Sequence, residues 1–288
     1  MPGTVTPGLA RAAGADLYYE RRGAGPPLLM ITGGGGDGGY FAAAADLLAD
    51  RYTVITYDRR GNSRSPLHGP PAAITMPGQS ADAVAVLAAN GFGSAAIFGN
   101  SGGATIALDL AAHHPEVAGL VVAHEPPVPS VLADAREYLA NFEEIDRVLA
   151  TDGWRAALLM FQITIGLVPM ARPEVHQLLL KPAAFLPPGP RRDTMTRVSG
   201  NWAYMMHYEV RPFTDYRPDL GRIRGNRVPI VLACGTATKD PWQVEMSVRA
   251  AELLGTECVR FSGGHSAPME IPRTFAPELA ALLARLGY

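Results

Sequence analysis

The feature that most constrains the fold is an alternation of short apolar segments with longer segments of helical pattern. Short apolar runs, typical of strands buried on both faces of a sheet, occur at residues 28–31, 52–57, 95–98, 120–123, 230–234 and 258–261. Helical patterns stand between or after them at residues 41–49, 80–89, 102–113, 242–254 and 272–286. A hairpin is predicted ahead of them, from two segments that Gly14 separates. This order predicts an α/β fold whose sheet is mostly parallel and is covered by helices on both sides.

One long interval breaks the alternation. Between residues 125 and 227 only helical patterns occur, at residues 131–149, 154–165, 174–180 and 192–207, and prolines separate them. Because strands and helices alternate again after this interval, a separate downstream domain is disfavoured. The sequence therefore predicts a core formed by residues 1–124 and 228–288, with residues 125–227 inserted as a helical cap.

The strongest local motif is Gly99-Asn100-Ser101-Gly102-Gly103, a G-x-S-x-G sequence between a predicted strand and an alanine-rich predicted helix. A sharp strand-to-helix turn strains the backbone of its serine, and side chains two residues away on either side would collide there. Such a turn also places the hydroxyl at a helix N-terminus, where partial positive charge favours an alkoxide-like transition state. We therefore predict that Ser101 is a nucleophile, whereas an ordinary Gly-Ser turn is the alternative.

A serine hydroxyl needs a base to remove its proton, and seven histidines compete for that role. His113 and His114 end the helix that begins at the nucleophile, so they should lie at the opposite edge of the sheet. His265 follows the last predicted strand through Gly263-Gly264, on a loop at the carboxyl ends of the strands, where active sites of parallel sheets collect. His265 is the predicted base.

The acid should come from another loop at a strand's carboxyl end, before the histidine in the chain. Asp240 is the only acidic residue of the loop 235–241, and it completes the order Ser, Asp, His that this kind of site shows. Glu125, directly after the preceding strand, is the rival candidate. Asp240 has a structural alternative as well, because an Asp-Pro pair commonly starts a helix. We predict Asp240 as the acid and keep Glu125 open.

A glycine-rich stretch, residues 33–39, follows the predicted strand 28–31. It lacks the Gly-Lys-Ser/Thr of a phosphate loop and does not fit the dinucleotide pattern. The prediction is that the backbone N–H groups of Gly34 and Gly102 form an oxyanion hole. No cofactor and no metal site are predicted.

With these pieces in place, the chain resembles the α/β-hydrolase superfamily over nearly its whole length. The matching segments are residues 29–34, 57–63, 99–103, 235–240 and 263–265, with Thr32 where relatives often carry histidine. The resemblance implies an eight-stranded sheet with a helical cap. Ser101 disfavours the dehalogenase and epoxide-hydrolase branches, which use aspartate there, and Asn100-Ser101 is similar to the carbon-carbon bond hydrolases of aromatic degradation.

Apolar residues are the main candidates for binding a substrate within the predicted cap. They are Trp154, Met160, Phe161, Met170, Trp202, Tyr204, Met205 and Met206. For most of these residues we prefer the interpretation that they pack inside the cap and do not contact a substrate. The predicted function is hydrolysis of an ester, lactone or thioester of a small, mostly apolar molecule. The alternatives are a lyase, a carbon-carbon bond hydrolase or cofactor-independent oxygenase that reuses the triad, and a slow-turnover ligand-binding receptor.

The net charge and the lengths of the apolar runs limit the kinds of partner that the chain can bind. The net charge is −2 and no run of five like charges occurs, which argues against a nucleic-acid partner. The basic pairs 21–22, 59–60 and 191–192 are interpreted as solvated surface charges. No apolar run is long enough to span a membrane, and Cys234 and Cys258 are interpreted as buried free thiols. We expect a cytoplasmic protein that acts on a small molecule, and no oligomeric state is predicted.

Overall fold

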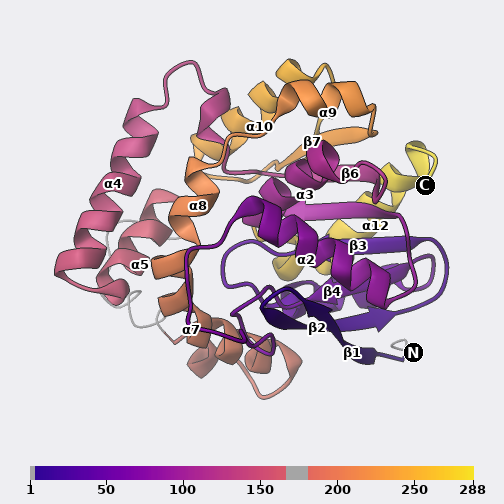
Figure 1. Cartoon of the computed structure of the whole chain (residues 1–288), viewed down its shortest axis with the longest axis horizontal. Coiled ribbons are helices and arrows are strands. Elements are labelled where there is room, and N and C mark those ends of the chain that lie inside the picture. The colour runs from indigo at the N-terminus through magenta and orange to yellow at the C-terminus, as the bar shows by residue number, and fades with distance from the viewer. Residues whose placement is uncertain (1–3, 167–180) are drawn as a thin grey trace.

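The computed structural model describes residues 4–166 and 181–288. Its eight strands form one sheet in the order β1-β2-β4-β3-β5-β6-β7-β8 (Figure 1). The strands are β1 (Thr6–Ala12), β2 (Ala15–Arg22), β3 (Pro27–Ile31), β4 (Thr53–Tyr57), β5 (Ala95–Asn100), β6 (Ala118–His124), β7 (Ile230–Gly235) and β8 (Cys258–Phe261). The pairs β1/β2 and β2/β4 are antiparallel and all others are parallel. The predicted hairpin and mostly parallel sheet are confirmed.

Helices cover both faces of the sheet because alternate strand residues point to opposite sides. In β3, Leu28 and Met30 pack into one core with α1 (Ala42–Leu48) and α12 (Pro272–Arg285). Leu29 and Ile31 pack into the other core with α2 (Met76–Ala89), α3 (Gly102–His113) and α10 (Pro241–Leu254). The continuous apolar run of this strand is therefore buried on both faces, as the sequence predicts.

Four helices, which we call the cap helices, lie together at one end of the sheet, on the left of Figure 1. They are α4 (Arg136–Thr151), α5 (Trp154–Thr164), α7 (Pro190–Tyr208) and α8 (Val210–Asp215). The helix predicted at 131–149 is α4, which begins later because a short 3-10 helix, η2 (Pro129–Val131), comes first. The helix predicted at 174–180 lies outside the described residues.

The short helices were the elements that the sequence pattern did not predict. They include α8 and α9 (Leu220–Asn226), of six and seven residues, which are too short to display a helical period. Helix α9 packs against α3 and α10 of the sheet layer. The others are η1 (Gly38–Phe41), η3 (Pro182–Phe185) and α11 (Ala267–Glu270).

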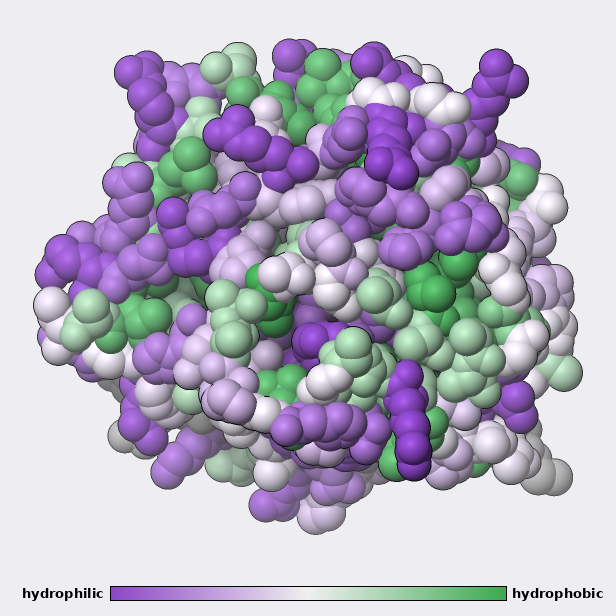
Figure 2. Space-filling view, viewed as in Figure 1, coloured by the Kyte–Doolittle hydropathy of each residue, from purple (hydrophilic) through white to green (hydrophobic). Residues whose placement is uncertain are grey.

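The face of the molecule in Figure 2 mixes hydrophilic residues with smaller groups of hydrophobic ones. Within residues 4–166 and 181–288, no helix has the length and apolar character needed to cross a membrane. Cys234 and Cys258 lie on the neighbouring strands β7 and β8 as free cysteines, with their Sγ atoms 3.6 Å apart.

Candidate active site

Ser101 lies at a sharp turn between β5 and α3. Its φ of 57° and ψ of −127° are a conformation that residues other than glycine rarely adopt. The turn is close-packed: a Cβ on Gly103 would lie 2.0 Å from the carbonyl oxygen of Ile31, and one on Gly99 would lie 2.3 Å from that of Gly103. The Ser101 N–H donates to the carbonyl of His124, 2.9 Å away. The two outer glycines of the motif are therefore required by space, as the sequence analysis expects.

His265 follows β8 on the loop that the sequence predicts, and its side chain is largely buried. The loop turns at Gly263, whose φ of 84° lies in the left-handed region. The side chain of Asn100 fastens this loop to the serine turn, because its Nδ2 donates to the backbone oxygen of His265 over 3.2 Å. The same Nδ2 lies 2.8 Å from Nδ1 of His124. Asn100 thus connects the strand before the serine to the histidine loop.

Glu125 is the carboxylate that the structure brings to the imidazole. Its Oε2 lies 2.5 Å from Nδ1 of His265, and its side chain is fully buried. Its other oxygen, Oε1, accepts hydrogen bonds from the N–H of Gly235 at 2.8 Å and the hydroxyl of Thr238 at 2.5 Å. Both carboxylate oxygens are therefore satisfied, which offsets the cost of burying a charge.

The surroundings keep Glu125 ionised. Burial alone would raise its pKa, but the hydrogen bond and charge of His265, with the N–H of Gly235, hold the pKa of the Glu125 carboxyl at about 2. His124, beside it in the sequence, behaves in the opposite way: burial lowers the pKa of its imidazole to about 4, so it stays neutral at physiological pH. Near pH 7 the charge next to His265 is thus a fixed negative one.

Asp240 occupies a different role. It is the N-cap of α10, where its Oδ1 accepts the N–H of Trp242 at 2.9 Å. Its side chain is buried, which raises its pKa, and its Oδ2 has no hydrogen-bond partner among the described residues. Asp240 thus has the structural role that its Asp-Pro pair suggests: its carboxylate caps the helix that starts at Pro241. The structure therefore corrects the predicted contact: Glu125, and not Asp240, lies against His265.

The glycine-rich loop after β3 runs against the serine turn. A Cβ on Gly33 would lie 2.6 Å from the Cβ of Ser101, so only glycine fits there. The N–H groups of Gly34 and Gly102 donate no hydrogen bond to any acceptor in the described ranges. For Gly102 this follows from its place as the first residue of α3. Gly102 thus directly follows Ser101, Gly34 lines the same cavities as Ser101, and neither N–H has a partner among the described residues.

Arg59 holds that loop in place. Its Nη2 donates to the carbonyl of Gly33 at 2.9 Å, and its guanidinium forms a fully buried ion pair with Glu209, at the start of α8, with N–O distances of 2.7 and 2.8 Å. Asn62 also donates to Glu209, at 2.8 Å. Interpreting Arg59 as a solvated surface charge was wrong, because this residue joins the loop to the cap helices.

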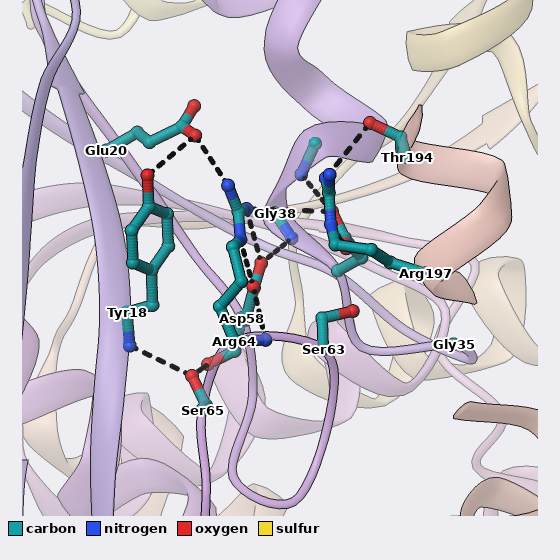
Figure 3. A network of polar contacts seen from close by, with 12 residues as sticks. Tyr18, Glu20, Gly35, Gly38, Asp58, Ser63, Arg64, Ser65, Thr194 and Arg197 are labelled. Atoms are coloured by element: carbon teal, nitrogen blue, oxygen red, sulfur yellow. Dashed lines mark hydrogen bonds and ion pairs between the residues drawn. The ribbon is translucent and has the colours of Figure 1, made fainter. Parts of the chain in front are cut away.

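A second network of polar contacts, drawn in Figure 3, also holds this loop. Asp58 accepts the N–H of Gly38 at 2.8 Å and pairs with Arg64 at 2.7 Å. Arg197, on cap helix α7, pairs with Asp37 over 2.6 Å. The loop that carries Gly34 is therefore bonded both to the sheet and to the cap.

A cavity of about 220 Å³ opens onto Ser101 and His265. Its lining from the cap helices is mostly apolar and consists of Leu158, Phe161, Gln162, Ile165, Met195, Trp202 and Met205. Three of the residues proposed from the sequence therefore reach the cavity: Phe161, Trp202 and Met205. Met170 lies outside the described residues.

Comparison with known proteins agrees with this architecture. The model of the alpha/beta hydrolase fold family matches residues 26–153. The uncharacterized hydrolase YraK of Bacillus subtilis (strain 168) is 29% identical over 98% of this chain and 97% of its own length.

Solved structures share the fold. An alpha/beta hydrolase from Sphaerobacter thermophilus DSM 20745 superposes with a TM-score of 0.69 and 24% identity, covering 96% of this chain and 100% of its own. A thermophilic esterase from Thermogutta terrifontis also gives 0.69, with 17% identity and 98% of both chains covered. The sheet order, the family match and these superpositions together show that the chain has the alpha/beta hydrolase fold.

Proposed function

We propose that this chain hydrolyses carboxylic esters, with lactones and thioesters in the same chemical class, by forming an acyl-enzyme on Ser101. Glu125 and His265 carry the proposal: their 2.5 Å contact lies beside a cavity that both His265 and Ser101 line. A histidine oriented by a buried carboxylate next to a strained serine is the arrangement that activates a hydroxyl for attack on a carbonyl.

In the first half of the reaction, the Oγ of Ser101 forms a bond to the ester carbonyl carbon while Nε2 of His265 takes the hydroxyl proton. Glu125 holds the proton on Nδ1 and stabilises the imidazolium that results. The carbonyl oxygen gains negative charge and is bound by the N–H groups of Gly34 and Gly102. The bond to the alcohol oxygen then breaks, and His265 returns the proton to that oxygen.

In the second half, His265 takes a proton from water, whose oxygen attacks the acyl carbon. The bond to Ser101 breaks, the serine oxygen recovers a proton from His265, and the carboxylic acid is released. Each half therefore balances in atoms and protons with Ser101, His265, the ester and water alone.

Labelling and turnover test the proposal together. A fluorophosphonate should add one phosphonyl group to Ser101, detected by intact mass and peptide mapping, and should abolish hydrolysis of p-nitrophenyl acetate. Ser101→Ala should remove both the label and the activity. A label mapped elsewhere, or an unchanged rate in Ser101→Ala, would overturn the assignment, and tight ester binding without turnover would favour a receptor instead.

A further inference from the structure

Two cavities meet at Ser101. The larger, of about 220 Å³, is the one described above, and the smaller measures about 40 Å³. The residues that line both are Gly34, Ser101, Phe161, Ile165 and Met205. An ester whose carbonyl carbon is bonded to Ser101 therefore has two spaces of unequal size in which to place its two halves.

His265 distinguishes the two spaces, because it lines the larger cavity and not the smaller one. The oxygen of the departing alcohol must receive its proton from His265, so the alcohol half has to lie on the histidine side. The acyl half is then left with the smaller cavity. Gly34 and Gly102, the proposed oxyanion residues, both line that smaller cavity, where the acyl carbonyl belongs.

The volumes limit each half. A cavity needs about 10–15 Å³ of such volume to hold one water molecule, so one of about 40 Å³ accepts about three non-hydrogen atoms beyond the carbonyl. The larger cavity accepts several times as many. The smaller cavity is closed by large side chains that are themselves buried, namely Tyr138, Phe142 and Phe213.

These observations rest on the proposed function and carry it further. We propose that the natural substrates are esters of a short acyl group, of acetyl to butyryl size, with a larger and mostly apolar alcohol. The chain is thus selective for a small acyl half and permissive for the alcohol half.

Two isomeric esters test this assignment directly. Phenethyl acetate carries the large group on the alcohol side, and methyl hydrocinnamate carries it on the acyl side. Both release a primary alcohol, so their intrinsic reactivities are close. Because a group that does not fit a pocket costs about 10- to 200-fold in kcat/KM, phenethyl acetate should be preferred at least tenfold.

A pair of cap variants provides the matched control. Val210, on α8, lines only the smaller cavity, whereas Met195, on α7, lines only the larger one. Val210→Ala should raise the kcat/KM ratio of p-nitrophenyl hexanoate to p-nitrophenyl acetate several-fold, and Met195→Ala should leave this ratio unchanged.

The failures of the two proposals are distinguishable. Equal rates on the isomers, a preference for methyl hydrocinnamate, or turnover of neither isomer by an enzyme that still hydrolyses p-nitrophenyl acetate would overturn the cavity assignment alone. A shifted acyl preference in Met195→Ala but not in Val210→Ala would do the same. Absence of both ester turnover and Ser101 labelling would overturn the proposed function itself.

Discussion

The Oε2 of Glu125 lies 2.5 Å from Nδ1 of His265, and these two residues come from loops that follow β6 and β8. In the sheet β7 stands between those strands, and the N–H of Gly235 at its end donates to the other oxygen of Glu125. The carboxylate therefore spans one strand to reach the imidazole. In this position Glu125 has a backbone φ of 51°, which is unusual for a residue other than glycine.

Replacing this carboxylate tests its proposed role. Glu125→Gln keeps the size of the side chain but removes the charge that stabilises the imidazolium, so kcat should fall by about four orders of magnitude. Asp240→Asn is the matched control, because asparagine caps a helix as well as aspartate does and the N–H of Trp242 keeps its acceptor. Steady-state kinetics on p-nitrophenyl acetate near pH 7 compare the two. A crippled Asp240→Asn beside a nearly normal Glu125→Gln would restore the aspartate as the acid.

His124 makes stability depend on pH. Burial lowers the pKa of its imidazole to about 4, whereas the unfolded value is about 6.5. Between these values the unfolded chain binds a proton that the folded chain does not, so this contribution is fully present above about pH 6.5 and is lost as the pH falls toward 4. His124→Gln removes the titrating group. Urea unfolding should show that the variant narrows its stability gap to the wild type by about 2 kcal/mol between pH 7 and pH 5. A gap that is independent of pH would contradict the buried, neutral state of His124.

The sequence predicts the sheet, its strand positions and the sharp turn that carries Ser101, the proposed nucleophile, because each depends on local pattern. Ser101 is recognised from glycines whose Cβ positions are blocked by backbone, and His265 from its place after the last strand. Both signals lie within a few neighbouring residues.

The positions of Glu125, the proposed acid, and of the buried Arg59 depend on contacts across the fold, which local pattern does not reveal. Asp240 and Glu125 both follow strands at the same edge, and the helix start at Pro241 decides between them by turning Asp240 away. A position directly after a strand therefore limits the candidates for the acid to these two residues, and only the folded structure distinguishes them. Arg59 looks like a surface charge until Glu209, 150 residues later, is packed against it.

The close packing of the serine turn predicts that alanine is far more destabilising at Gly103 than at Gly200, which lies within α7. Gly103→Ala places a Cβ 2.0 Å from the carbonyl oxygen of Ile31, and the next nearest atoms, in Ile31 and Thr32, are also backbone and cannot move aside as a side chain could. The variant should unfold at a much lower temperature and lose activity. Gly200→Ala, within α7, meets nothing within 4 Å and should raise stability by up to about 1 kcal/mol through helix propensity. Thermal unfolding of both variants measures this, and comparable melting temperatures would contradict the close packing of the turn.

The buried pair of Arg59 and Glu209 predicts that stability and activity can be separated. Glu209→Gln leaves the Arg59 charge buried without its counter-charge and should cost about 3–5 kcal/mol of unfolding free energy. A double variant, Arg59→Met with Glu209→Met, removes both charges and should recover most of that loss, because apolar side chains of similar size replace buried ion pairs at little cost.

The double variant should nevertheless remain a poor enzyme. Arg59 also donates to the carbonyl of Gly33, so its loss frees the loop that presents the N–H of Gly34 to the developing oxyanion. Misplacing one such donor costs about a hundredfold or more in kcat. Chemical denaturation and kinetics on the wild type, Glu209→Gln and the double variant give the three values needed. If the double variant recovers kcat together with stability, Arg59 serves the fold alone and the Gly33 loop is held by its bonds through Asp37 and Asp58.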